Sequence, residues 1–147
     1  MSSAPEPERA PPHTRGRALE GLHILVVDDH IGAVESLSFL LELEGARVLG
    51  AGSGAAALEL AAKARRIDLL LSDIGMPGMD GYELVAALHA LPAFATLPAI
   101  ALSGFGSSDD GGRALAAGFV DQLTKPVGIE RLVEAMRRVL PADPASI

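Results

Sequence analysis

Short, continuously apolar runs alternate along the chain with longer segments in which apolar residues recur every three to four positions. Residues 24–27 (Ile-Leu-Val-Val) illustrate the first kind and residues 129–140 the second. Short runs bounded by polar residues predict buried strands, and the longer spacing predicts amphipathic helices. We therefore expect strands at residues 23–28, 47–51, 69–73, 98–103 and 120–124, and helices at residues 31–44, 55–65, 81–90, 107–117 and 128–140. Alternating strand–helix units predict an α/β fold with a parallel sheet covered by helices on both faces.

The two ends of the chain differ in composition from this alternating region. Residues 1–20 combine four prolines with charged and small residues, and they hold little that a core could bury. Such a segment cannot offset the entropy cost of ordering, so we expect a disordered, proline-rich leader. We expect one domain at residues 21–141 and a short tail at residues 142–147, with no room for a second domain.

Composition excludes several functional classes. The 147 residues include no cysteine, which excludes a disulfide scaffold, a thiolate metal site and a cysteine nucleophile. The net charge of −7 is unlike that of proteins that bind nucleic-acid phosphates. The apolar runs are too short for a membrane helix, and the amino terminus lacks the apolar stretch of a secretory signal. We therefore expect a cytoplasmic protein that binds neither nucleic acid nor membrane.

Polar residues with related chemistry follow the predicted strands. Asp28 and Asp29 follow the first strand, Asp73 ends the third, Ser103 ends the fourth, and Lys125 follows the fifth. In open parallel sheets, ligands bind at the carboxyl ends of the strands, so these side chains should converge. Carboxylates held together repel unless a cation neutralises them, and Mg²⁺ prefers such oxygen ligands. Because aspartate can act as a nucleophile toward phosphorus, this set suits phosphoryl transfer to a carboxylate.

At this point the chain resembles a known family, the receiver domains of two-component response regulators, of either the single-domain or the hybrid-kinase type. The resemblance covers about residues 22–140. The motifs that carry it occur in the expected order: Ile-Leu-Val-Val-Asp-Asp at 24–29, Leu-Ser-Asp-Ile-Gly-Met-Pro-Gly-Met-Asp-Gly at 71–81, Ala-Leu-Ser-Gly at 101–104, Ala-Gly-Phe at 117–119, and Leu-Thr-Lys-Pro at 123–126. The resemblance implies a flavodoxin-like, doubly wound (βα)5 fold whose five-stranded parallel sheet has the strand order 2-1-3-4-5.

The resemblance also implies a metal site. Asp73 matches the residue that accepts the phosphoryl group. Asp29 matches a direct Mg²⁺ ligand, and Asp28 matches a ligand that often acts through water. The backbone carbonyl of Gly75 matches a further ligand of the metal.

Other residues match the parts of the family that respond to phosphorylation. Ser103 matches the hydroxyl that turns toward the phosphoryl group, and Lys125 matches the family's lysine, whose bond to Pro126 is usually cis. Gln122 stands where the family usually carries Tyr or Phe. Because Gln offers no apolar ring, we expect it to stay at the surface and the loop at 104–110 to carry the change instead.

The family receives its phosphoryl group from a phosphohistidine of a histidine kinase or phosphotransfer protein. We therefore expect a signalling phosphoprotein, switched by phosphorylation and read by a downstream protein, with only slow self-dephosphorylation. An aspartyl-phosphate phosphatase is the enzymatic alternative, but it needs an acid two residues after the nucleophile, where this chain has Gly75. A flavin carrier of similar fold is the third alternative, but acids follow the first strand and aromatic residues are scarce.

Overall fold

The central sheet has five parallel strands. The computed structural model describes residues 18–104 and 112–140. Hydrogen bonding places the strands in the order β2-β1-β3-β4-β5, which confirms the predicted α/β fold and its strand order. The strands are β1 (His23–Val27), β2 (Arg47–Ala51), β3 (Leu69–Asp73), β4 (Ala99–Ser103) and β5 (Asp121–Thr124).

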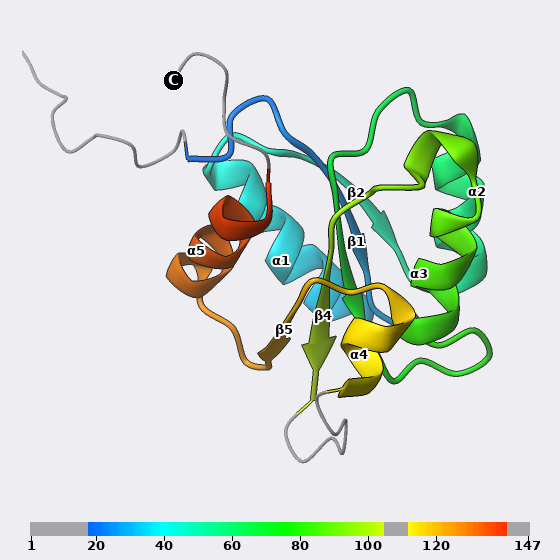
Figure 1. Ribbon diagram of the computed structural model, residues 1–147. Helices are drawn as coiled ribbons and strands as arrows, with labels where there is room; N and C mark the ends of the chain where they lie inside the picture. Colours follow the sequence, from blue (N-terminus) through cyan, green and yellow to red (C-terminus); the bar gives the residue numbers. More distant parts are fainter. Residues whose placement is uncertain (1–17, 105–111, 141–147) are drawn as a thin grey trace, which may run out of the picture.

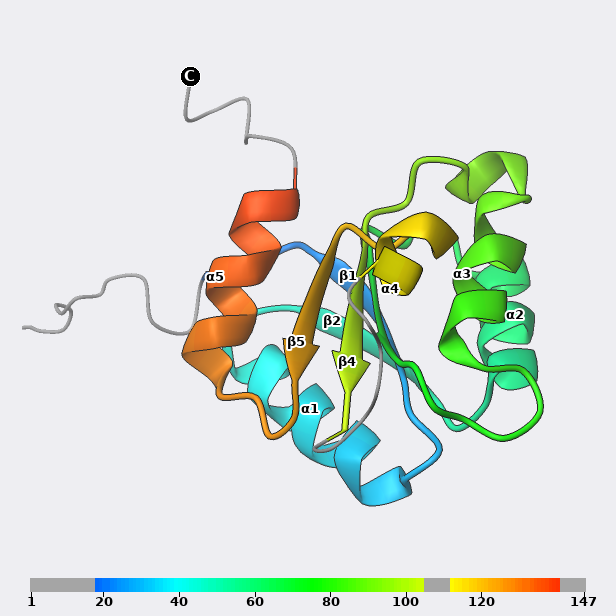
Figure 2. The same cartoon turned by 60° about the horizontal axis from the view of Figure 1, so that its bottom comes forward.

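Helices cover both faces of the sheet. In Figure 1, α1 and α5 lie on one side of the strands, and α2 and α3 lie on the other; Figure 2 shows the same division from a second direction. The helices are α1 (Ile31–Leu43), α2 (Gly54–Lys63), α3 (Gly81–His89), α4 (Gly112–Ala117) and α5 (Ile129–Val139), with a 3-10 turn η2 (Pro92–Phe94) before β4. Within the described residues, no helix is long and apolar enough to cross a membrane. The predicted fourth helix began at residue 107, and residues 105–111 lie outside the described part of the chain.

The sheet separates two apolar cores because successive strand side chains point to opposite faces. On β1, Leu25 and Val27 join the core beneath α2 and α3, whereas Ile24 and Val26 join the core beneath α1 and α5. All four side chains are at most 1% exposed. A strand buried on both faces has no polar alternation, which is why the central strands are continuously apolar in sequence.

Local signals set where the helices begin and end. Gly45 follows α1 with a φ of +98°, a conformation that costs glycine little, so it ends the helix as predicted. Asp80 caps α3 by accepting a hydrogen bond from the Glu83 backbone N–H (2.9 Å), and Glu83 Oε1 accepts one from the Asp80 N–H (3.0 Å). This reciprocal capping box fixes the start of α3 at Gly81, eight residues after Asp73.

The domain extends further toward the amino terminus than predicted. Leu19, which the sequence analysis placed in the leader, is 1% exposed and packs in the core beneath α1 and α5. Its backbone N–H donates a hydrogen bond to the Glu44 carbonyl (2.9 Å), and its carbonyl accepts one from Leu22 (3.1 Å). The predicted boundary at residue 21 was therefore wrong, because a single leucine beside charged residues has no periodic pattern to reveal its burial. The remainder of the predicted leader, residues 1–17, and the tail after residue 140 lie outside the described residues.

Candidate functional site

Four strands deliver the predicted side chains to one edge of the sheet. The register aligns Val27 with Ser72, Asp73 with Leu102, and Ser103 with Thr124, so the carboxyl ends of β1, β3, β4 and β5 lie side by side. Asp28 follows β1 directly, and Asp73 is the last residue of β3. The expected convergence at this edge is therefore observed.

Lys125 connects the carboxylates from two different strands. Its Nζ donates a hydrogen bond to Asp28 Oδ2 at 2.8 Å and lies 3.3 Å from Asp73 Oδ1. Asp28 is 0% exposed and Asp73 is 5% exposed, so water screens these charges poorly. The peptide bond from Lys125 to Pro126 is cis, as the family resemblance implied.

The pKa values of the two carboxylates that contact Lys125 are shifted in opposite directions. Burial alone would raise the pKa of Asp28, but the Lys125 ammonium and the His30 backbone N–H hold that pKa below its usual value. Burial raises the pKa of Asp73 above its usual value, although Lys125 opposes the shift. The neighbouring charges of Asp28 and Asp29 raise the pKa of Asp73 further. Burial would lower the pKa of Lys125, but its two carboxylate partners raise it.

The donor set fits a hard divalent cation. The carboxylates of Asp28 and Asp73 contact the Lys125 ammonium, and the charge of Asp29 acts on Asp73, so these four groups carry a net charge near −2 when all are ionised. Burial and the neighbouring carboxylates raise the pKa of Asp73, so a further cation nearby would favour its ionised form. Asp29 has a side chain that is 26% exposed, so its oxygens are open to an ion from solvent. Asp28, Asp29 and Asp73 are therefore candidate ligands of a divalent cation, with the Gly75 carbonyl as a further candidate.

The structure shows fewer contacts for three other predicted residues, Ser103, Gly75 and Gln122. Ser103 is 5% exposed at the end of β4, and its hydroxyl donates to the Leu123 carbonyl over a long 3.5 Å. Gly75 is exposed in the loop after β3. Gln122 is half-buried, and its backbone N–H donates to Asp121 Oδ1 (2.8 Å). The loop at 104–110, which we expect to change conformation on phosphorylation in place of Gln122, lies almost entirely outside the described residues.

His30 is a neighbour of the site that the sequence analysis left out. Its Nδ1 lies 3.3 Å from Asp28 Oδ1 and 3.4 Å from Asp29 Oδ1. No histidine of the sequence has a partner at the spacing of a metal-binding helix, so that pattern gives no indication of His30. The available signal was adjacency, since His30 directly follows the two acids.

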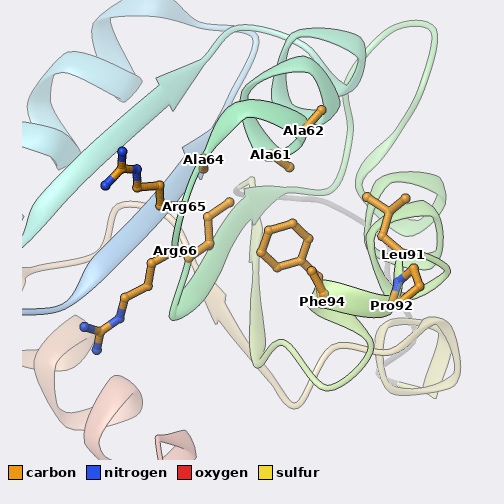
Figure 3. A pocket seen from close by; sticks show the side chains of 10 residues that line it. Ala61, Ala62, Ala64, Arg65, Arg66, Leu91, Pro92 and Phe94 are labelled. Carbon is orange, nitrogen blue, oxygen red and sulfur yellow. The ribbon is translucent and has the colours of Figure 1, made fainter.

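One cavity of the described residues lies away from this site. It measures about 480 Å³ and opens between the end of α2 and η2, as Figure 3 shows. Its lining includes Ile67, which precedes β3, whereas Asp73 ends that strand. No carboxylate lines this cavity, so it supplies none of the chemistry predicted for the strand ends.

Comparisons with known sequences agree with this arrangement. The family profile described as "Response regulator receiver domain" matches residues 24–137. The chain is 41% identical over 128 residues to an uncharacterized 14.6 kDa protein of Leptolyngbya boryana, covering 87% of this chain and 97% of that protein. It is also 38% identical to the virulence sensor protein BvgS of Bordetella pertussis, over 99% of this chain but only 12% of the length of BvgS.

Solved structures show the same likeness in three dimensions. The chemotaxis response regulator CheY4 of Vibrio cholerae superposes with a TM-score of 0.74 at 34% identity, covering 81% of this chain and 98% of CheY4. The signal receiver domain of a histidine kinase from Syntrophus aciditrophicus superposes with a TM-score of 0.72 at 33% identity, covering 82% and 90% of the two chains. With the fold, the strand order and the profile match in agreement, this chain belongs to the family of response regulator receiver domains of two-component systems.

Proposed function

We propose that Asp73 accepts a phosphoryl group from a phosphohistidine of a histidine kinase or phosphotransfer protein, and that Mg²⁺ assists the transfer. The observation that carries this proposal is the bridge made by Lys125, whose Nζ contacts both Asp28 and Asp73 at the carboxyl ends of the strands. This bridge holds a buried aspartate beside a fixed positive charge. Such an arrangement suits a nucleophile whose product carries additional negative charge.

Each residue of the site has a separate role in the phosphoryl transfer. A carboxylate oxygen of Asp73 attacks the phosphorus of the donor, and a P–O bond forms as the P–N bond breaks. The imidazole of the donor keeps the electron pair and takes up a proton from solvent. Lys125 stabilises the charge of the transferred group, and the Ser103 hydroxyl donates a hydrogen bond to one of its oxygens. When bound, Mg²⁺ would neutralise further negative charge on the phosphoryl oxygens.

The same arrangement favours a switch over an enzyme with its own small-molecule substrate. Two residues after Asp73 the chain has Gly75, which offers no acid to protonate a leaving group. We therefore propose that the phosphorylated state is read by a partner protein and that self-dephosphorylation is slow. The proposed donor kinase uses ATP, so a cytoplasmic location forms part of this proposal.

The test is Mg²⁺-dependent labelling of the full chain by a phosphorylated histidine kinase or a small acyl phosphate. Wild-type protein should gain one phosphoryl group in Mg²⁺ and none in excess chelator, and Asp73→Asn should gain none. Asp68→Asn is the matched control, because Asp68 precedes β3 and so lies at the opposite end of the same strand. Labelling of Asp73→Asn, or undiminished labelling in chelator, would contradict the proposal.

A further inference from the structure

The ring of His30 faces the acid pair at the start of α1. His30 is the residue before α1, yet its side chain makes no capping hydrogen bond to that helix. The side chain is 77% exposed. Within the described residues, Asp28, Asp29 and His30 form the one group of three potential ligand side chains whose donor atoms all lie within 4.8 Å of one another.

The separations within this group resemble those of metal ligands. Nδ1 of His30 lies 3.3 Å from Asp28 Oδ1 and 3.4 Å from Asp29 Oδ1. The contact with Asp28 Oδ1 is a long hydrogen bond, and both separations exceed the roughly 2.7–2.9 Å of a charge-assisted hydrogen bond. An ion with bonds of about 2.0–2.2 Å holds neighbouring donor atoms roughly 3 Å apart. One nitrogen therefore stands nearly equidistant from two carboxylate oxygens, at close to the spacing that a shared ion requires.

The nitrogen donor changes which ions the site should prefer. Mg²⁺ binds oxygen ligands and retains several waters, so an imidazole adds little to its affinity. First-row transition ions such as Co²⁺, Ni²⁺ and Zn²⁺ accept imidazole nitrogen readily. We propose that His30 is a further ligand of this metal site, through Nδ1, and that it shifts the preference of the site from Mg²⁺ toward these ions. The inference rests on the proposed function, because Asp28 and Asp29 are the residues assigned there to the metal.

Calorimetric titration of the unphosphorylated full chain measures this preference. Mg²⁺ and Co²⁺ are titrated separately into wild type, His30→Gln and the control His23→Gln, whose residue lies at the opposite end of β1. His30→Gln should weaken Co²⁺ binding by at least about tenfold. Loss of a residue that only supports a metal ligand already costs about 10–100-fold in affinity, and loss of a ligand itself should cost no less. Its Mg²⁺ affinity should change by less than about twofold, because that ion retains water in place of nitrogen. An unchanged ratio of the two affinities would overturn the inference.

Nuclear magnetic resonance identifies the atom. In protein labelled with ¹⁵N at histidine, saturating Zn²⁺ should shift the Nδ1 resonance of His30, while the rings of His23 and His89 serve as internal references. An unshifted His30 resonance would overturn the inference, and the inference stands only if the titration and the resonance both agree. Phosphoryl labelling of Asp73 in wild-type protein with Mg²⁺ is measured in a separate experiment. A negative result for His30 with normal labelling refutes this inference alone, whereas absent labelling refutes the proposed function.

Discussion

Replacing Gly81 with alanine should show how tightly the start of α3 is packed against the loop that follows Asp73. A Cβ at Gly81 would lie 2.9 Å from Ile74 Cα and would also meet the backbone oxygen of Asp73. Both neighbours are backbone atoms, so they cannot give way by a change of rotamer. The Gly81 N–H also donates to the Ile74 carbonyl (2.9 Å), which ties the helix to the same loop.

Two opposing effects determine the magnitude. Alanine is a better helix former than glycine by about 1 kcal/mol, which would stabilise the variant. Forcing a methyl group into packed structure costs about 1–3 kcal/mol. The contact is with backbone of a fully buried strand end, which favours the upper part of that range. We therefore expect Gly81→Ala to lower the free energy of unfolding by about 1–2 kcal/mol after the propensity gain is subtracted.

Urea denaturation at 25 °C measures this change, and Gly32→Ala is its matched control. Gly32 also lies in the first turn of a helix, but an added Cβ would meet nothing within 4 Å. Gly32→Ala should therefore raise the free energy of unfolding by about 0.5–1 kcal/mol. The two variants should move the midpoint in opposite directions at equal m-values. If Gly81→Ala is as stable as wild type, the packing argument is refuted.

Three further predictions concern the site and the domain boundary. In chelator at pH 7, Asp73→Asn should raise the melting temperature by a few degrees, because burial and the charges of Asp28 and Asp29 raise the pKa of Asp73 and its ionised form destabilises the fold. The gain in melting temperature should shrink as the pH falls through that raised pKa. A melting temperature at pH 7 below that of wild type would contradict this prediction. Leu19→Ala should lower the free energy of unfolding by about 2–4 kcal/mol in urea titrations, since the side chain is 1% exposed. An unchanged urea midpoint would show that Leu19 does not contribute to the core. Ser103→Ala should slow phosphoryl transfer by about tenfold or more in a labelling time course while Asp73 remains the acceptor, and an unchanged rate would remove the hydroxyl from the mechanism.

The strands and the residues at their ends were predictable from sequence for one physical reason. Strands β1, β3 and β4 are buried on both faces and largely apolar, so the polar residues at the end of each run mark the carboxyl end of the strand. The prediction for β3, residues 69–73, matches the structure at both boundaries, and it places Asp73 at the edge where Asp28 and Lys125 also lie. The family motifs then supplied the strand order, which a periodicity argument leaves open.

The features that escaped prediction depend on contacts between distant parts of the chain or on single residues. Leu19 is buried by elements that come later in sequence, and no local pattern shows it. The hydrogen bond from Lys125 to Asp28 joins residues 97 positions apart, so only the tertiary structure reveals that one ammonium serves two carboxylates. His30 has no partner at helical metal-ligand spacing, and its approach to Asp29 arises at a strand–helix junction.

The central claim is that Asp73 is the residue phosphorylated, and chemical trapping followed by peptide mapping tests it most directly. Wild-type full chain is phosphorylated in Mg²⁺, reduced with borohydride to convert any aspartyl phosphate to homoserine, digested, and sequenced by mass spectrometry. The account predicts homoserine at position 73 alone, and none when chelator replaces Mg²⁺. Homoserine at Asp28, Asp29 or another aspartate, or an unmodified Asp73 in protein that carries the phosphoryl group, would contradict it.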